Sequence, residues 1–293
     1  MSAPAITAEV ALRAAPIHGE GPWWDGRAGV LWWVDILAME IHRSDPATGS
    51  DACWRVPEHV GAVVGRSSGG AVALLQSGFA AIDERGDLTW LAQVEAHDAT
   101  TRFNDGKCDP LGRLVGGTLS YLKTRGAGSL YRLDVDHSVT RLLTGLTLSN
   151  GLAWSPDGET MYLIDSGSRS LKMYGYDDDR GSDGHLTPRD EIALGPGVPD
   201  GMTIDSEGCL WVAMYGAGLV RRFTPKGQAV RQVVVPATGV TSCIFGGSRL
   251  DQLYVTTSSY SLSAEERRAQ PDAGSIFVCA PGVSGRPEPF FAG

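Results

Sequence analysis

The feature that most constrains this chain is a short phrase that occurs six times: a polar, glycine-containing turn followed at once by an apolar strand. The six apolar strands are anchored at Leu31, Ala71, Leu114, Met161, Leu210 and Leu253. Successive anchors are about 40 to 49 residues apart, which is the period of a four-stranded propeller blade. We therefore expect an all-β fold, a six-bladed β-propeller of four-stranded antiparallel blades.

Each anchor strand is followed by another turn and a further alternating strand, as at residues 128–134 and 171–176, which is typical of antiparallel meanders. Only residues 263–270 have the composition of a short helix, of one or two turns. A pair of β-sandwiches would also contain short strands at regular spacing. Sandwiches have no reason to repeat one turn-and-strand phrase six times, so we favour the propeller.

The N-terminal segment offers a way to close the ring of blades. Apolar residues alternate with other residues at Ile6, Ala8, Val10 and Leu12, as in a strand. A propeller without ring closure would expose strand edges. We expect this N-terminal strand to complete the last blade beside the C-terminal segment, so that residues 1–293 form a single domain.

Composition limits the partners of the chain. Its formal net charge of −9 argues against nucleic acid and anionic membranes. No apolar stretch approaches the roughly 18 residues of a membrane span, and residues 1–12 do not resemble a signal peptide. The five cysteines form no C-x-x-C pair, which fits a reducing compartment. We expect a cytoplasmic protein.

Four polar residues occupy the same place in their repeats. Glu20, Asn104, Asn150 and Asp200 each lie 10 or 11 residues before an anchor, and each lies beside or close to a glycine. We expect them just before the first strand of a blade, with Asp200 on a stiff loop after Pro199. First strands line the central channel, so these side chains should converge at one mouth of it.

Two carboxylates and two amides around a channel form a site for a hard or borderline divalent cation. Asn-Gly and Asp-Gly are also ordinary turn dipeptides, but four such residues in one register favour a site. The equivalent places in the other two repeats hold Gly61 and residues 241–243, which are poor ligands for a hard metal.

Six phrases of the chain resemble the regucalcin/gluconolactonase family of six-bladed propellers, which includes sugar lactonases. They are residues 19–24, 102–107, 149–155, 162–166, 199–202 and 243–247. The resemblance implies that Glu20, Asn150 and Asp200 bind the metal, that Arg102 and Asn104 contact substrate hydroxyls, and that Asp200 is the catalytic base.

The chain departs from this family in two places. After Gly117-Thr118, residues 119–122 are Leu-Ser-Tyr-Leu where animal members carry acidic residues, so the substrate preference of those members does not carry over. His18 replaces a more usual apolar residue, and we expect a packed surface histidine there rather than one at the rim of the pocket.

The leading hypothesis is a metal-dependent sugar lactonase that hydrolyses an aldonolactone, such as a gluconolactone, xylonolactone or arabinonolactone, to its aldonic acid. The cation would polarise the carbonyl group and activate a water molecule, and Asp200 would take a proton or only orient the water. Ca²⁺ and Zn²⁺ are favoured, and Mg²⁺, Mn²⁺ or Fe²⁺ remain possible. Arg102 could instead form a loop ion pair with Asp105 or Asp109, and Asn104 could bind metal or substrate.

Two other functions stay open. One is a propeller esterase that acts on other lactones or organophosphates, and the other is a non-catalytic calcium-binding protein. The non-catalytic protein could also bind a protein partner. In the leading hypothesis we expect a monomer whose partner is a small molecule, a sugar lactone.

Other signals are weaker. Residues 65–69 match the nucleophile-elbow motif G-x-S-x-G, but they occupy the polar turn of the second repeat. The acidic run at 177–184 is more typical of a solvated loop than of a calcium-binding loop. The remaining histidines form no metal-binding pair, so no metal is assigned to His42, His59, His97, His137 or His185. We expect five tryptophans of the blade strands to pack in the core or against the sheets: Trp23, Trp24, Trp32, Trp33 and Trp211.

Overall fold

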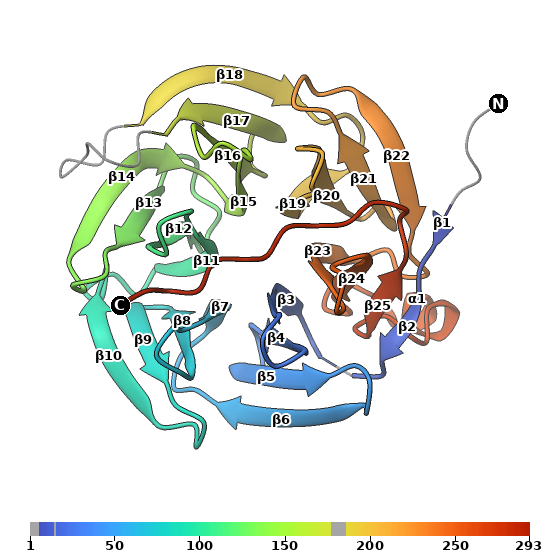
Figure 1. Cartoon of the computed structure of the whole chain (residues 1–293), viewed down its shortest axis with the longest axis horizontal. Helices are drawn as coiled ribbons and strands as arrows, with labels where there is room; N and C mark the ends of the chain where they lie inside the picture. Colours follow the sequence, from blue (N-terminus) through green and yellow to red (C-terminus); the bar gives the residue numbers. More distant parts are fainter. Residues whose placement is uncertain (1–5, 15, 177–185) are drawn as a thin grey trace.

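The computed structural model describes residues 6–14, 16–176 and 186–293. Its strands form six sheets arranged as blades around a central axis (Figure 1). Five sheets have four strands and one has five. The predicted six-bladed, all-β propeller is confirmed. The acidic run at 177–184 lies outside the described residues.

Each blade is an antiparallel meander that begins at the axis and runs outward. Blade 1 contains β3 (Gly19–Asp25), β4 (Val30–Asp35), β5 (Glu40–Asp45) and β6 (Ser50–Arg55). Blade 2 contains β7 (Val60–Gly65), β8 (Ala71–Leu75), β9 (Gly78–Ile82) and β10 (Leu88–Gln93). Blade 3 contains β11 (Thr101–Cys108), β12 (Leu114–Ser120), β13 (Gly128–Leu133) and β14 (Val139–Leu146).

The second half of the ring has the same plan. Blade 4 contains β15 (Ser149–Trp154), β16 (Thr160–Asp165), β17 (Ser170–Gly175) and β18 (Thr187–Ala193). Blade 5 contains β19 (Val198–Ile204), β20 (Leu210–Tyr215), β21 (Leu219–Phe223), β22 (Ala229–Val234) and the added β1 (Ile6–Thr7). Blade 6 contains β23 (Val240–Gly246), β24 (Gln252–Thr257), β25 (Ile276–Cys279) and β2 (Glu9–Leu12).

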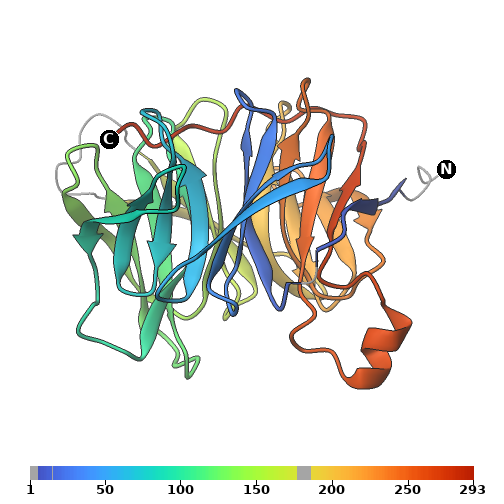
Figure 2. The ribbon, with the colours of Figure 1, turned by 90° about the horizontal axis from the view of Figure 1, so that it is seen from below.

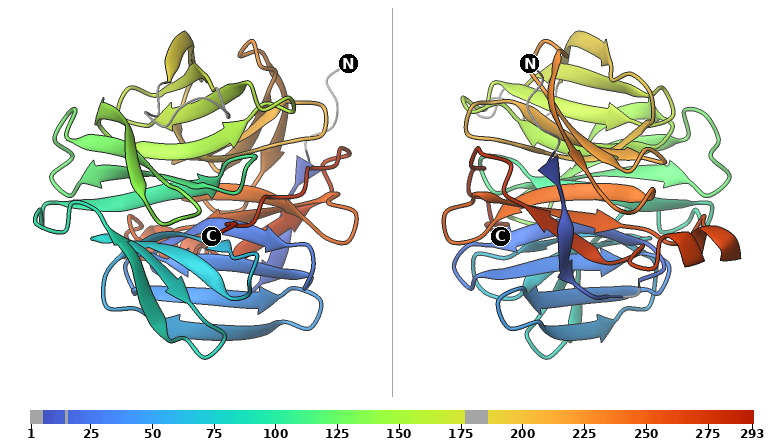
Figure 3. Two further views of the ribbon diagram at one scale, coloured as in Figure 1. Left: turned by 60° about the vertical axis from the view of Figure 1, so that its left-hand side comes forward. Right: turned by 90° about the vertical axis from the view of Figure 1, so that its right-hand side faces the viewer.

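The N-terminal segment closes the ring as predicted. Strand β2 pairs antiparallel with β25, with Val10 opposite Phe277. Strand β1 goes further than expected, because it pairs in parallel with β22 of blade 5, with Ile6 opposite Val233. Figure 3 (right) shows this segment running across the outer edges of both blades. The first strands of the chain therefore join two blades that are formed by its last third.

One detail of the predicted register is wrong. The anchor residues lie in the second strand of each blade, and the four candidate site residues lie inside the first strand rather than before it. Asp200 is part of β19 and not of a loop. The physical reason is a β-bulge in every first strand, which breaks the two-residue alternation by which a strand is recognised in a sequence.

The repeated polar turn joins the first strand of a blade to the second. In blade 5 its leading residue is Asp205, which is fully buried. Its carboxylate accepts hydrogen bonds from the backbone N–H of Cys209 (2.9 Å), from Trp211 Nε1 (2.9 Å) and from Arg222 Nε (2.7 Å). The turn is therefore fastened to the second and third strands, which explains why this phrase recurs. The G-x-S-x-G match is one of these turns, between β7 and β8.

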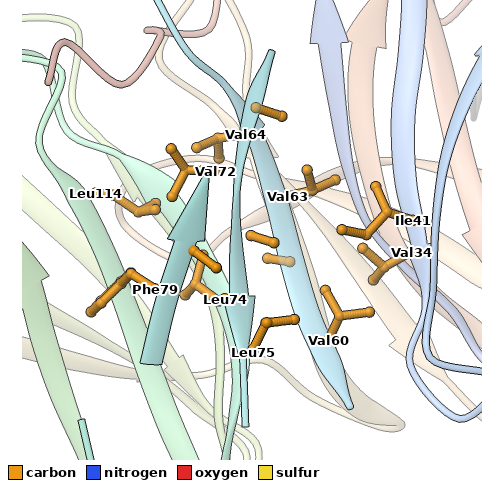
Figure 4. Packing of buried hydrophobic residues seen from close by; sticks show 14 of the residues in the cluster. Val34, Ile41, Val60, Val63, Val64, Val72, Leu74, Leu75, Phe79 and Leu114 are labelled. Atoms are coloured by element: carbon orange, nitrogen blue, oxygen red, sulfur yellow. The ribbon is translucent and has the colours of Figure 1, made fainter. Parts of the chain in front are cut away.

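The hydrophobic core lies between neighbouring blades. Figure 4 shows Val60 and Val63 of blade 2 facing Val34 and Ile41 of blade 1, while Phe79 lies toward Leu114 of blade 3; all six residues belong to one buried cluster. The five tryptophans expected to pack in the core are all buried, most completely Trp23, Trp33 and Trp211.

The two ends of the channel differ. Residues 280–293, here called the C-terminal strap, cross one end of the ring (Figures 1 and 2). Phe291 N–H donates to Gly65 O (2.9 Å), Ala292 N–H donates to Gly112 O (2.9 Å), and Lys107 Nζ lies 3.4 Å from Glu288 Oε1. The other end carries the short helix α1 (Ala264–Ala269).

Helix α1 matches the expected short helix at 263–270. Ser263 caps it, and the Ser263 and Glu266 side chains each accept a hydrogen bond from the other's backbone N–H. Among the described residues, no helix has the length and apolar character to cross a membrane.

The close approach of first strands predicts a stability effect. A Cβ atom at Gly151 would lie 2.8 Å from Asp200 O and 2.7 Å from Met202 Cγ. We expect Gly151→Ala to lower the free energy of unfolding by about 1–3 kcal/mol, measured by urea denaturation, because blades 4 and 5 would have to separate. The control is Gly26→Ala, where the nearest atom is 4.0 Å away. Equal stability of the two variants would contradict this account.

Candidate metal and substrate site

The candidate site is built by the bulges of the first strands. Each of the six first strands shifts register at the same level, which turns a side chain toward the axis. Three of these bulges contain Asn104, Asn150 and Asp200, and Glu20 lies directly before the bulge of β3. The other two carry Gly61 and Thr241, as the sequence register predicts. All four polar side chains are buried.

The glycines beside these residues do not form turns. Gly151 and Gly201 lie inside strands, where neighbouring blades come too close for a side chain. A Cβ atom on Gly201 would lie 2.0 Å from Ser242 Oγ, and one on Gly61 would lie 2.6 Å from Asn104 O. The turn interpretation of the Asn-Gly and Asp-Gly pairs is therefore wrong. Glycine is required there because six strands meet around one axis.

A chain of hydrogen bonds orients the two amides. Asn104 Nδ2 donates to Ser149 O (2.8 Å) and to Asn150 Oδ1 (2.9 Å). Asn150 Nδ2 donates to Ser166 Oγ (2.9 Å), and Ser166 Oγ donates to Pro199 O (2.5 Å). These bonds fix which atom of each amide is the oxygen, so that Asn150 Oδ1 keeps a lone pair for a further partner.

Arg102 lies at the edge of this network. Its Nη1 atom donates to Asn104 Oδ1 (2.9 Å) and to Phe103 O (2.9 Å), and its guanidinium group lies 5.9 Å from the ring of Tyr121. The alternative partner Asp109 is bound instead to Arg113 Nε (2.6 Å) in a blade turn. Asn104 thus connects Arg102 to Asn150.

Three buried carboxylates share the channel. Burial raises the pKa of Glu20 well above its usual range, and the nearby charges of Asp200 and Asp105 raise it further. Burial and the Asp105 charge likewise raise the pKa of Asp200. Burial raises the pKa of Asp105 to about 6, although the charge of Lys107 acts in the opposite direction. Each carboxylate is therefore harder to ionise in the metal-free protein.

Sequence reasoning missed Asp105 as a member of the site. It follows Asn104 directly, and strand alternation would point the two side chains to opposite faces. The bulge at Asn104 breaks that alternation, so Asp105 lines the inner channel with Lys107. The acidic residue in the Asn-Asp-Gly phrase could have indicated a further site residue. The sequence pattern does not show at which residue of a strand a bulge occurs.

Two further aspartates position the site strands. Asp35 ends β4 and accepts hydrogen bonds from the backbone N–H groups of Ile17 (2.7 Å) and His18 (3.1 Å), just before β3 begins. Asp165 ends β16 and accepts one from Leu148 N–H (3.0 Å), just before β15 begins. An aspartate at the end of an apolar second strand is the sequence signal for this role.

The rim of the mouth is polar and aromatic. Tyr121 comes from the run that departs from animal relatives, and its hydroxyl lies 2.7 Å from His59 Nδ1. His18 lies 2.7 Å from Ser258 Oγ, and burial together with the positive charge of Arg102 lowers its pKa to about 4. His18 is therefore neutral and packed, as expected, but it also lies near Arg102 at the rim.

The donor set fits a divalent cation. Glu20 and Asp200 supply carboxylate oxygens, Asn150 supplies an amide oxygen, and burial removes the water that would otherwise screen their charges. Carboxylates that raise one another's pKa in a closed space are stabilised by an added positive charge. Water molecules would complete the coordination of such a cation.

Comparison with known proteins agrees with this architecture. Residues 18–259 match the model of the SMP-30/Gluconolactonase/LRE-like region. The chain is 38% identical over 289 residues to 6-deoxy-6-sulfogluconolactonase of Pseudomonas putida, covering 98% of this chain and 99% of that protein. It is 40% identical over 283 residues to regucalcin of Gallus gallus, covering 94% and 95%.

A solved structure extends the similarity to three dimensions. The calcium-binding protein regucalcin of Agrobacterium tumefaciens superposes with a TM-score of 0.91 at 29% identity, covering 99% of both chains. The matched phrases include the strands that carry Glu20, Asn104, Asn150 and Asp200. This chain is therefore a member of the SMP-30/gluconolactonase/regucalcin family.

Proposed function

We propose that the protein is a metal-dependent sugar lactonase that hydrolyses an aldonolactone to its aldonic acid. The proposal is supported by the burial of Glu20, Asn150 and Asp200 and by the charge interactions of Glu20 with Asp200 and of both with Arg102. Asn104 links Arg102 to Asn150 by hydrogen bonds. The similarity to 6-deoxy-6-sulfogluconolactonase supports a lactone as the substrate class. The reaction is the hydrolysis of a carboxylic ester.

In this proposal Glu20, Asn150 and Asp200 hold the cation. When bound, it supplies Lewis acidity that polarises the lactone carbonyl and acidifies a water molecule. Asp200 orients the attacking water and accepts its proton. It returns this proton to the ring oxygen as the ring C–O bond of the lactone breaks, which leaves a hydroxyl group. Arg102 donates hydrogen bonds to sugar hydroxyls or to the developing carboxylate.

Asn104 is assigned a positioning role. Its amide nitrogen donates to Asn150, and its amide oxygen accepts from Arg102. Because both groups are in use, Asn104 is better suited to hold Asn150 and Arg102 at a fixed distance than to bind the metal. Asp105 lies deeper in the channel, where its charge adds to the attraction for a cation.

We also propose that the protein is cytoplasmic and monomeric and that it forms a single domain. The described cysteines are all free, as in a reducing compartment, and a single ring supplies every site residue. Calcium is favoured by the oxygen-only ligand set and by the calcium-binding relative, and zinc is the second choice.

The first prediction from this proposal concerns Asp200. With a panel of aldonolactones and acid release as the readout, we expect metal-loaded Asp200→Asn to lose about 100-fold or more in kcat/KM, because the water loses its proton acceptor. The matched control is Asp157→Asn, the same chemical change in the turn that joins β15 to β16.

Wild-type turnover in folded Asp200→Asn would refute the role of this residue. If the folded, metal-loaded wild type hydrolysed no lactone above the uncatalysed rate, the site would be a binding site only. A turnover restricted to other lactones or organophosphates would favour the esterase alternative.

The second prediction concerns pH and follows from the raised pKa values. The carboxylate of Asp105 titrates near 6 in the folded protein and near 4 when unfolded. A raised pKa in the folded state stabilises at low pH and loses that contribution as pH rises through it. We expect the Tm of the EDTA-treated protein to fall as the pH rises from about 4 to about 6, and to fall less with a bound cation or in Asp105→Asn. A pH-independent Tm without metal would contradict the charge cluster.

The third prediction tests the orientation of Asn150. The variant Ser166→Ala removes the acceptor of the Asn150 amide group. We expect it to weaken the binding of Ca²⁺ or Zn²⁺ about tenfold to a hundredfold in calorimetric titrations, because Ser166 holds Asn150 in the orientation that binds the metal. Ser168→Ala is the control, because Ser168 Oγ bonds Asp165 O (3.1 Å) and Ser170 Oγ (2.7 Å) in the next turn. Similar affinities of both variants would show that Asn150 needs no such support.

A further inference from the structure

A second group of metal-ligating side chains lies on the outer half of blade 1. Glu40 and His42 are two residues apart on β5, so they project from the same face of the sheet. Cys53 lies on β6, directly opposite His42 in the ladder. The three side chains therefore meet on one face of a two-stranded ribbon, although Cys53 is 13 residues from Glu40 in the sequence.

The distances between the ligand atoms suit a single ion. His42 Nε2 lies 3.7 Å from Glu40 Oε2 and 3.8 Å from Cys53 Sγ, and all three ligand atoms lie within 4.8 Å of one another. Two atoms bound about 2.0–2.3 Å from a tetrahedral zinc ion are roughly 3.3–3.6 Å apart. A small rotation of the Glu40 side chain, which is 25% exposed, would complete this geometry.

An independent contact orients the histidine. His42 Nδ1 lies 2.8 Å from Asp51 Oδ2, and Asp51 Oδ1 accepts a hydrogen bond from Ser44 Oγ (2.6 Å). The imidazole ring also stacks on Trp33, with 3.9 Å between ring centroids. A carboxylate on one ring nitrogen is the usual outer partner of a metal-bound histidine, and it directs Nε2 toward Glu40 and Cys53.

We propose that Glu40, His42 and Cys53 form a second divalent-metal site, separate from the channel and selective for a zinc-like ion. The mixed nitrogen, oxygen and sulfur ligands suit zinc or cobalt better than calcium or magnesium, which prefer oxygen. The site borders a cleft of about 520 Å³ between blade 1 and the N-terminal segment, lined by Glu40, His42 and Asp51. This cleft leaves room for a fourth ligand from solvent.

The competing explanation is an ionic cluster without metal. A protonated His42 would lie between Glu40 and Asp51, and Glu40 Oε1 already lies 3.3 Å from Arg55 Nε. That explanation gives Cys53 no role. The thiol therefore decides between the two, because only a bound metal would form a bond to its sulfur.

The test uses Co²⁺ as a probe on the full-length protein. Cobalt bound to a thiolate has an intense near-ultraviolet charge-transfer band, whereas cobalt bound by the oxygen ligands of the channel does not. We expect wild type to develop this band with one cobalt per chain and Cys53→Ser to lack it. Cys209→Ser, which removes a thiol from the turn between β19 and β20, should keep it.

Two further measurements separate this site from the channel. Asp51→Asn should keep the band but weaken cobalt binding about tenfold to a hundredfold, since it removes only the outer partner of His42. Lactone hydrolysis by Cys53→Ser should equal that of wild type, whether or not the lactonase proposal holds. Absence of the band in wild type, or its survival in folded Cys53→Ser, would overturn the proposal.

Discussion

The rest of the structure depends on the close approach of six strands around one axis. Gly61, Gly151 and Gly201 mark the points where backbone meets backbone or a short side chain of the next blade, with no room for a Cβ atom. The bulge in β19 contains Asp200 beside Gly201, whereas the bulge in β7 contains only Gly61, which presents no side chain. The same constraint that lets the ring close therefore also sets the number and direction of the groups that the channel can present.

This arrangement concentrates negative charge where water is scarce. Burial raises the pKa of Glu20, Asp105 and Asp200. The charge of Asp105 raises the pKa of Glu20 and Asp200 further, and Arg102 and Lys107 offset only part of these effects. Such a cluster costs stability in the absence of a ligand, and a fold keeps it only if the surrounding structure holds it in place. The closed ring does so through β2 in blade 6 and through the C-terminal strap, whose Glu288 pairs with Lys107 at the far end.

Most of the fold was predictable because the repeat is local. Each blade carries its own polar turn, and the period of about 40 to 49 residues gives the number of blades. In blade 5 the turn residue Asp205 bonds the two strands that follow it. The strand numbering within a blade was wrong because bulges at Glu20, Asn104 and Asp200 hide the first strand. The pairing of β1 with β22 was not predicted, because the sequence around Ile6 does not indicate a partner strand more than 200 residues away.

By itself, the sequence determined the six-fold repeat, the equivalence of Glu20, Asn104, Asn150 and Asp200, and the ring closure by residues 9–12, because all three are encoded as spacing or alternation. Only the tertiary structure decided that Asp105 joins the channel, that Ser166 orients Asn150, and that Cys53 meets His42 across a ribbon. These contacts depend on bulges and on the packing of neighbouring strands. A difference of one residue in register would place the same side chains on the opposite face.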